Sequence, residues 1–86
     1  MKFETGQLVC TIGVITEQKK NPAFALFVNK SLDRHLKGDW GDLGEEDKKS
    51  NDDALETGER ILSAYEADGF PKIWIITECN RSATTI

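Results

Sequence analysis

Carboxylates are the most numerous side chains that could do chemistry in this chain, and most of them lie in one segment. Residues 39–59 hold nine of the fifteen acidic residues, and the only cations in that span are Lys48 and Lys49. Such a segment is typical of a solvated helix face, and it also suits attraction of a basic partner protein, because complementary charge speeds association. The residues we assign to partner contact are Asp39, Trp40, Asp42, Glu45, Glu46, Asp47, Asp52, Asp53 and Glu56.

A second set of residues could line a small ligand-binding or catalytic pocket under Trp40, which is the alternative function: His35, Asp39, Glu78 and Arg81. His35 is the only histidine and lies on the apolar side of an expected helix, where a hydrogen-bonded core residue is the simpler interpretation. Glu78 and Arg81 flank an expected turn, which they could fix through a local ion pair or hydrogen bonds. Alternatively, Arg81 could reach Asp39 or Asp42 and hold the loop that contains Trp40. No spacing matches a metal-ligand set or a nucleophile motif, so we predict no catalytic residue, metal or cofactor.

The segment GDWGDLG, residues 38–44, places a large apolar side chain in a hydrophilic stretch. One interpretation folds Trp40 back as a lid between the helices and the sheet. The other turns it toward a partner, because tryptophan is enriched among the residues that dominate binding energy. The acidic surroundings and the missing GxxxxGK[ST] pattern exclude a phosphate-binding loop.

Length and composition limit the classes of protein that this chain can belong to. Its 86 residues make a single domain, 1–86, and 38% hydrophobic with 30% charged residues is typical of a globular protein. The net charge of −4 argues against direct nucleic-acid binding. The sequence has neither a secretion signal nor an apolar run of the ~18 residues that span a bilayer, so we expect no membrane association and a cytoplasmic location. Cys10 and Cys79 lack metal-ligand spacing and are predicted to be small buried core residues.

The pattern of elements predicts an α+β fold of order β-α-α-β-β, with two helices packed on one face of a small antiparallel three-stranded sheet. Residues 7–16 are rich in β-branched side chains, which favours a covered strand. Asn21 and Pro22 predict the start of a helix that stops at Gly38. Asp42 and Glu45 predict the capping box of a second helix.

The second helix is expected to continue through Gly58 and to end before Gly69. The segment KIWIIT, residues 72–77, is the strongest strand signal in the chain. The turn residues that follow it predict a hairpin with a third strand, residues 83–86.

Four blocks of the sequence together resemble a family of small bacterial proteins that are labelled plasmid-related and occur on plasmids, integrated elements and phages. The blocks are GQLVCTIGV, RHLKGDWGDLGEEDKKSNDDAL, GERILSAYEADG and KIWIITECNRSATTI, which cover nearly the whole chain. The family usually has aspartate at the position of Asn80 and continues past the last strand, so we expect further residues after Ile86. The resemblance implies a mobile-element setting and supplies no catalytic residue.

These observations favour a non-enzymatic module that binds a basic surface of a larger nucleic-acid-processing protein. The specific hypothesis is an inhibitor of a host defence system, of the anti-CRISPR or anti-restriction type. This extension is an analogy with other small acidic proteins of mobile elements, some of which present carboxylates where DNA phosphates would bind. A homodimer that pairs through an exposed sheet edge is a third hypothesis.

Overall fold

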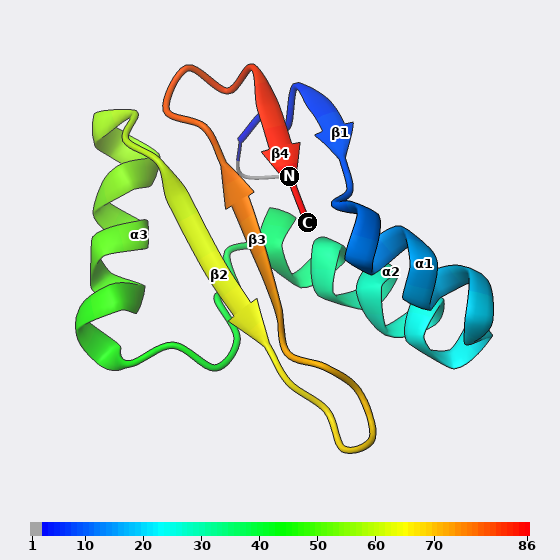
Figure 1. The fold of residues 1–86 in the computed structure, drawn as a ribbon. Helices are drawn as coiled ribbons and strands as arrows, with labels where there is room; N and C mark the ends of the chain where they lie inside the picture. Colours follow the sequence, from blue (N-terminus) through cyan, green and yellow to red (C-terminus); the bar gives the residue numbers. More distant parts are fainter. Residues whose placement is uncertain (1–2) are drawn as a thin grey trace.

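The computed structural model describes residues 3–86, which form three helices and four strands (Figure 1). The elements in chain order are β1 Gln7–Val9, α1 Ile12–Lys20, α2 Pro22–Leu36, α3 Glu45–Thr57, β2 Ile61–Tyr65, β3 Ile73–Thr77 and β4 Ala83–Thr85. The predicted α+β class is confirmed, whereas the order and number of elements differ from the prediction.

The four strands form one mixed sheet in the order β1-β4-β3-β2. β3 pairs antiparallel with both β4 and β2, so the predicted hairpin of the last two strands is confirmed. β1 runs parallel to β4, with Leu8 opposite Thr84. The prediction of a three-stranded antiparallel sheet is therefore wrong, because it lacks β2 and takes β1 as antiparallel.

The predicted strand 7–16 is divided between β1 and α1. Thr11 has an extended backbone, and its hydroxyl accepts a hydrogen bond from the backbone N–H of Val14 at 3.5 Å, so it caps the start of α1. No side chain of α1 is fully buried, and Ile12 is 83% exposed. Because β-branched residues lower helix propensity only slightly, the cap and the packing of α1 on α2 outweigh the strand-like pattern.

The predicted second helix is too long at both ends. α3 begins after Gly44, and Asp42 does not cap it, since its carboxylate accepts a hydrogen bond from the backbone N–H of Glu66 at 2.8 Å. α3 ends at Gly58, whose φ of 82° is the left-handed conformation that terminates helices. Residues 61–65, expected to be helical, form β2, so Gly58 is a helix terminator and not a mid-helix residue.

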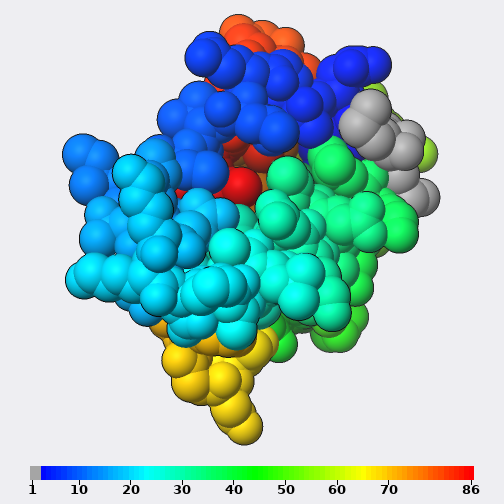
Figure 2. All heavy atoms as spheres, turned by 90° about the vertical axis from the view of Figure 1, so that its right-hand side faces the viewer, coloured from blue at the N-terminus to red at the C-terminus, as the bar shows by residue number. Residues whose placement is uncertain are grey.

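The main core lies between α2 and the inner face of the sheet. Phe24 and Val28 from α2 pack against Tyr65, Ile73 and Ile75, which alternate along β2 and β3. A second cluster, formed by the buried side chains of Trp40, Ala54 and Ile61, joins α3 to the same side of the sheet. Figure 2 shows α1 and α2 covering one side of the molecule, with the loop between β2 and β3 projecting beyond them.

The ends of α2 agree with the prediction. The Asn21 side chain accepts hydrogen bonds from the backbone N–H groups of Ala23 and Phe24, and Pro22 occupies the first turn. Gly38 follows the helix with a φ of 84°. The cysteine prediction holds only in part: Cys10 is half-buried against the core, whereas Cys79 is exposed in the turn after β3.

Candidate functional site

The outer side of α3 carries five exposed carboxylates, which we call the acidic face. Spacings of seven and eleven residues align Glu45, Asp52 and Glu56 on one stripe of the helix, and Glu46 and Asp53 form a second stripe beside it. The opposite side of α3 holds its two buried residues and contacts the sheet. The local pattern of the sequence is therefore enough to turn these five acids toward solvent.

Ion pairs neutralise little of the acidic face. Within residues 3–86, the one ion pair that reaches it joins Lys48 Nζ to Glu45 Oε1 at 4.0 Å, near the limit for such contacts. Lys49 is exposed on the same stripe and reduces the negative charge by one. The face as a whole stays acidic, and such an exposed pair contributes little to stability.

The three other acids assigned to partner contact lie elsewhere. Asp42 accepts a hydrogen bond from the backbone N–H of Glu66. Asp47 projects from another side of α3 and lines a pocket of about 200 Å³ with Arg60. Asp39 accepts two hydrogen bonds from the Arg34 guanidinium, at 2.7 and 3.1 Å, and this interaction holds the pKa of Asp39 below its ordinary value. The arrangement separates these three carboxylates from the acidic face.

Trp40 points into the protein. It is 3% exposed and lies in the second core cluster, with its ring centroid 5.8 Å from that of His35. Its indole N–H donates to the Asp52 carboxylate at 2.9 Å. The placement agrees with the lid interpretation and leaves the indole almost no surface for a partner. The hydrogen bond also ties the loop 38–44 to the acidic face.

Asn51 fixes α3 to the edge of the sheet. Its side-chain amide donates to the Leu62 carbonyl at 2.6 Å and accepts from the Leu62 N–H at 3.1 Å. Farther along β2, the Ala64 carbonyl accepts a hydrogen bond from the backbone N–H of Asp42 at 2.7 Å. These contacts satisfy backbone groups of an edge strand that would otherwise be open to pairing with another chain.

Arg81 secures the C-terminal end of α3. Its guanidinium donates to the Ala54 carbonyl at 3.1 Å and to the Glu59 carbonyl at 2.7 Å. A cation at this position complements the negative end of the helix dipole. Arg81 does not contact Asp39 or Asp42, as one interpretation of the sequence expected, and it bonds to the backbone carbonyl of Glu78 and not to its carboxylate.

His35 belongs to a buried chain of hydrogen bonds. Its Nδ1 lies 2.6 Å from Ser63 Oγ, and its Nε2 lies 2.9 Å from Thr77 Oγ1. Thr77 Oγ1 lies 2.8 Å from Thr84 Oγ1, which donates to the carbonyl of Thr5 at 2.8 Å. This network explains why a histidine and three hydroxyl groups are tolerated within the core.

The proton order in this chain follows from counting donors, since each hydroxyl has one proton. The Thr84 hydroxyl donates its proton to the Thr5 carbonyl. The Thr77 hydroxyl therefore donates to Thr84, and Thr77 Oγ1 accepts a hydrogen bond from His35 Nε2–H. Nδ1 is then the acceptor of the Ser63 proton, and the ring is neutral. Burial favours the same state, because it lowers the pKa of His35 to about 4.

The contact between Ser63 and His35 resembles part of a nucleophile–base pair, yet both side chains are 0% exposed. A substrate has no access to either atom. The alternative pocket is also not assembled, because His35 bonds within the core, Asp39 bonds to Arg34, and Arg81 bonds to carbonyls at the end of α3. The structure thus separates the residues that this alternative function needs together.

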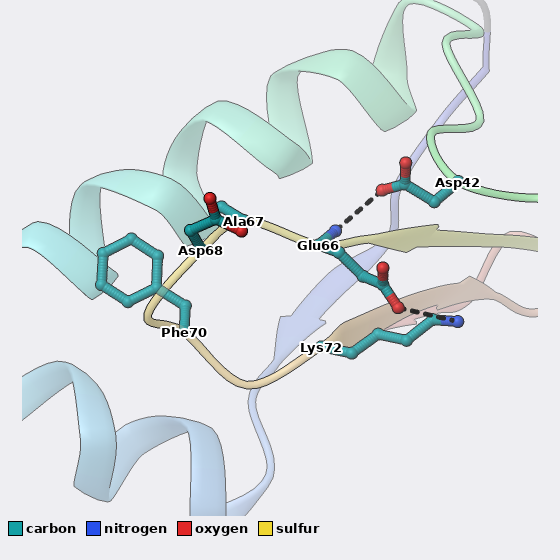
Figure 3. A pocket seen from close by; sticks show the side chains of 6 residues that line it. All are labelled: Asp42, Glu66, Ala67, Asp68, Phe70 and Lys72. Carbon is teal, nitrogen blue, oxygen red and sulfur yellow. Dashed lines mark hydrogen bonds and ion pairs between the residues drawn. The ribbon is translucent and has the colours of Figure 1, made fainter.

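A pocket of about 380 Å³ lies at the turn between β2 and β3 (Figure 3). Figure 3 shows Glu66 paired with Lys72, at 3.4 Å, and its backbone N–H directed at Asp42. Phe70 forms an apolar wall on one side of it. Because these polar groups already bind one another, the pocket offers no nucleophile with a base beside it.

Over the part of the chain that the structure describes, no group of three or more His, Cys, Asp or Glu side chains could hold a metal ion. No helix within residues 3–86 is both long and apolar enough to cross a membrane. Comparisons with protein-family models, curated proteins and solved structures found no match to the chain. The resemblance to plasmid-related bacterial proteins therefore stays a prediction.

Proposed function

We propose that this chain is a protein-binding module whose acidic face contacts a basic surface of a larger nucleic-acid-processing protein. One observation supports the proposal most strongly: five exposed carboxylates share one side of a helix that is fixed to the rest of the fold at its middle and at its C-terminal end. The anchors are the Asn51 amide, the Asp52–Trp40 hydrogen bond and the Arg81 guanidinium. A fixed array of charge loses little freedom on binding, which favours affinity.

The spacing of the charges fits a surface that binds nucleic acid. Eleven residues separate Glu45 from Glu56, which corresponds to about 16 Å of helix at ~1.5 Å per residue. Five carboxylates over this length are on average ~4 Å apart along the helix axis, and Lys49 on the same side lowers their summed charge by one. One strand of B-DNA carries a charge every ~3.4 Å along the axis. A row of lysine and arginine side chains that tracks a phosphate backbone would therefore meet charge of the same sign on α3, at a somewhat lower density.

The proposal extends to the biological setting that the sequence resemblance implies. We place the protein in the cytoplasm of a bacterial host, encoded by a plasmid, phage or integrated element, as an inhibitor of a defence system of the anti-CRISPR or anti-restriction type. The mechanism is occupation of a phosphate-binding channel by the acidic face. In this mechanism the protein does not itself bind nucleic acid, because its contact surface repels phosphate.

The test compares two triple variants with the same change of charge. The face variant, Glu46→Lys, Asp53→Lys and Glu56→Lys, reverses three acids that form no ion pair within residues 3–86. The control variant reverses acids outside α3, namely Glu4→Lys, Glu17→Lys and Asp68→Lys. Asp52 is left unchanged because it binds Trp40. Both variants change the net charge from −4 to +2.

Each protein is immobilised and used to capture binding proteins from a bacterial lysate at low and high salt. We expect the wild type and the control variant to capture the same nucleic-acid-binding protein, and high salt to release it. We expect the face variant to lose it. Equal capture by the two triple variants would show that the acidic face is not the contact surface.

A further inference from the structure

The face of the sheet turned away from α2 has no helix across it, and its side chains are half-buried or exposed except for the buried Ala64. The strand register places Leu62, Ile76, Thr85 and Val9 side by side across all four strands on this outer face. Beside this row lies Trp74, which is 49% exposed and lines a groove of about 280 Å³ together with Ile76, Thr85 and, at the start of α1, Thr11 and Val14. In Figure 1, β2 and β3 run between α3 on one side and α1 and α2 on the other, with no helix drawn in front of them.

Four charged residues frame this apolar surface, two at each end of the β2–β3 pair. Arg60 precedes β2 and Glu66 follows it, while Lys72 precedes β3 and Glu78 follows it. Strand alternation places all four on the outer face, since they are an even number of residues from Leu62 or Trp74. Two contacts agree with this placement: Lys72 Nζ lies 5.2 Å from the centre of the Trp74 ring and 3.4 Å from Glu66.

The four charges alternate in sign around the apolar surface, and we call this arrangement the checkerboard. Antiparallel pairing sets Glu66 beside Lys72 at one end and Arg60 beside Glu78 at the other, so each strand has a base at its start and an acid at its end. When two copies meet face to face, their two-fold axis lies in the plane between the sheets. An axis across the strands brings Arg60 over Glu66 and Lys72 over Glu78 of the second copy. An axis along the strands brings Arg60 over Glu78 and Lys72 over Glu66.

We propose that two copies of this chain associate face to face through the outer surface of their sheets. Charge complementarity favours a second copy of the chain as the partner, because either orientation places every base of one copy over an acid of the other. The apolar rows supply most of the affinity, while exposed ion pairs of this kind contribute little energy and mainly fix orientation. With the axis across the strands, Trp74 packs over Ile76 of the second copy. Two sheets packed in this way lie ~10 Å apart, as in a β-sandwich.

The association is independent of the proposed function and rests on different residues. The acidic face lies on the side of α3 opposite Asn51 and Ala54, which contact the rest of the fold. Both acidic faces of the dimer would therefore stay accessible to a partner. The interface also differs from pairing through a sheet edge, because it buries side chains of the face and leaves the strand edges as they are.

The test uses two variants that change the checkerboard in opposite directions. The acidic variant, Arg60→Glu with Lys72→Glu, makes all four positions negative, and the basic variant, Glu66→Lys with Glu78→Lys, makes all four positive. Sedimentation equilibrium at micromolar concentrations should give twice the monomer mass for the wild type. Each variant alone should give the monomer mass, because like charges then face one another. An equimolar mixture should return to twice the monomer mass, because the two faces are again complementary.

A third variant, Trp74→Ala, tests the apolar part of the interface and should also have the monomer mass. Because Trp74 is half exposed, its replacement should leave the far-ultraviolet circular dichroism spectrum unchanged, which separates loss of association from loss of folding. A wild type that sediments as a monomer would overturn the proposal. So would variants that dimerise like the wild type, or a mixture of acidic and basic variants that stays monomeric.

Discussion

Acidification from pH 7 to pH 5 should lower the free energy of unfolding by about 2 kcal/mol through one residue, His35. Burial lowers the pKa of His35 from its ordinary value of 6.5 to about 4 in the folded chain. The unfolded chain therefore binds the proton more tightly than the folded chain does. The contribution of neutral His35 to stability is complete above pH 6.5 and is lost as the pH falls toward 4.

The magnitude follows from this difference in pKa. One pKa unit corresponds to ~1.4 kcal/mol, so the full loss below pH 4 is about 3 kcal/mol, and at pH 5 about 2 kcal/mol has been lost. The hydrogen-bond chain explains the cost, because a proton on Nδ1 would face the Ser63 hydroxyl that donates to it. Ser63 would have to turn its proton away within a site that excludes water.

Urea unfolding at pH 7, 6 and 5, at constant ionic strength and protein concentration, measures this change. The assignment is direct because the chain has a single histidine. In the variant His35→Gln, stability at pH 7 should be lower, but its dependence on pH between 7 and 5 should nearly vanish. An NMR titration of the His35 ring gives the pKa itself. Equal unfolding free energies at pH 7 and 5, or a pKa near 6.5, would show that burial of His35 does not make stability depend on pH.

Three substitutions test the anchors of the loop and of α3 by thermal or urea unfolding. Gly41→Ala should destabilise by more than ~3 kcal/mol, because φ is 75° and the new Cβ would lie 2.0 Å from the Ala64 carbonyl oxygen; a loss below ~1 kcal/mol would contradict the packing. Trp40→Phe keeps an aromatic ring but removes the donor to Asp52, so we expect a loss of ~1–3 kcal/mol, and no loss would mean that the hydrogen bond is not formed. Asn51→Ala leaves two backbone groups of the edge strand without partners, which should cost ~2–4 kcal/mol and promote aggregation, whereas unchanged stability would argue against the anchor.

Elements that depend on local signals were predictable from the sequence. The α2 helix has its Asn21 cap and its Pro22 start, and β3 with the following hairpin has continuous apolar residues and turn residues. The β1–α1 boundary was not predictable, because the whole segment has a strand-like composition. Pairing with β4 makes its first part a strand, and the Thr11 cap starts a helix in the rest. Periodicity also failed at Gly58, since residues 61–65 fit a helix stripe and a strand equally well.

The candidate site shows the same division. Helical spacing was enough to place five carboxylates on one side of α3, whereas the direction of Trp40 depended on a contact with Asp52 that lies twelve residues away. The role of Asn51 was not recognised from the sequence, although an amide on an otherwise apolar or small stripe is a usable signal, because buried polar groups need partners. The inward-facing Thr77 and Thr84, which complete the His35 network, give no comparable signal.

The most direct test of the central claim is competition between this protein and DNA for the protein that it captures. The measured quantity is the binding of a fluorescent DNA duplex to that captured protein, while the concentration of wild type, face variant or control variant is increased. We expect the wild type and the control variant to displace the duplex, and the face variant not to displace it. Displacement by all three proteins, or by none of them, would contradict this expectation.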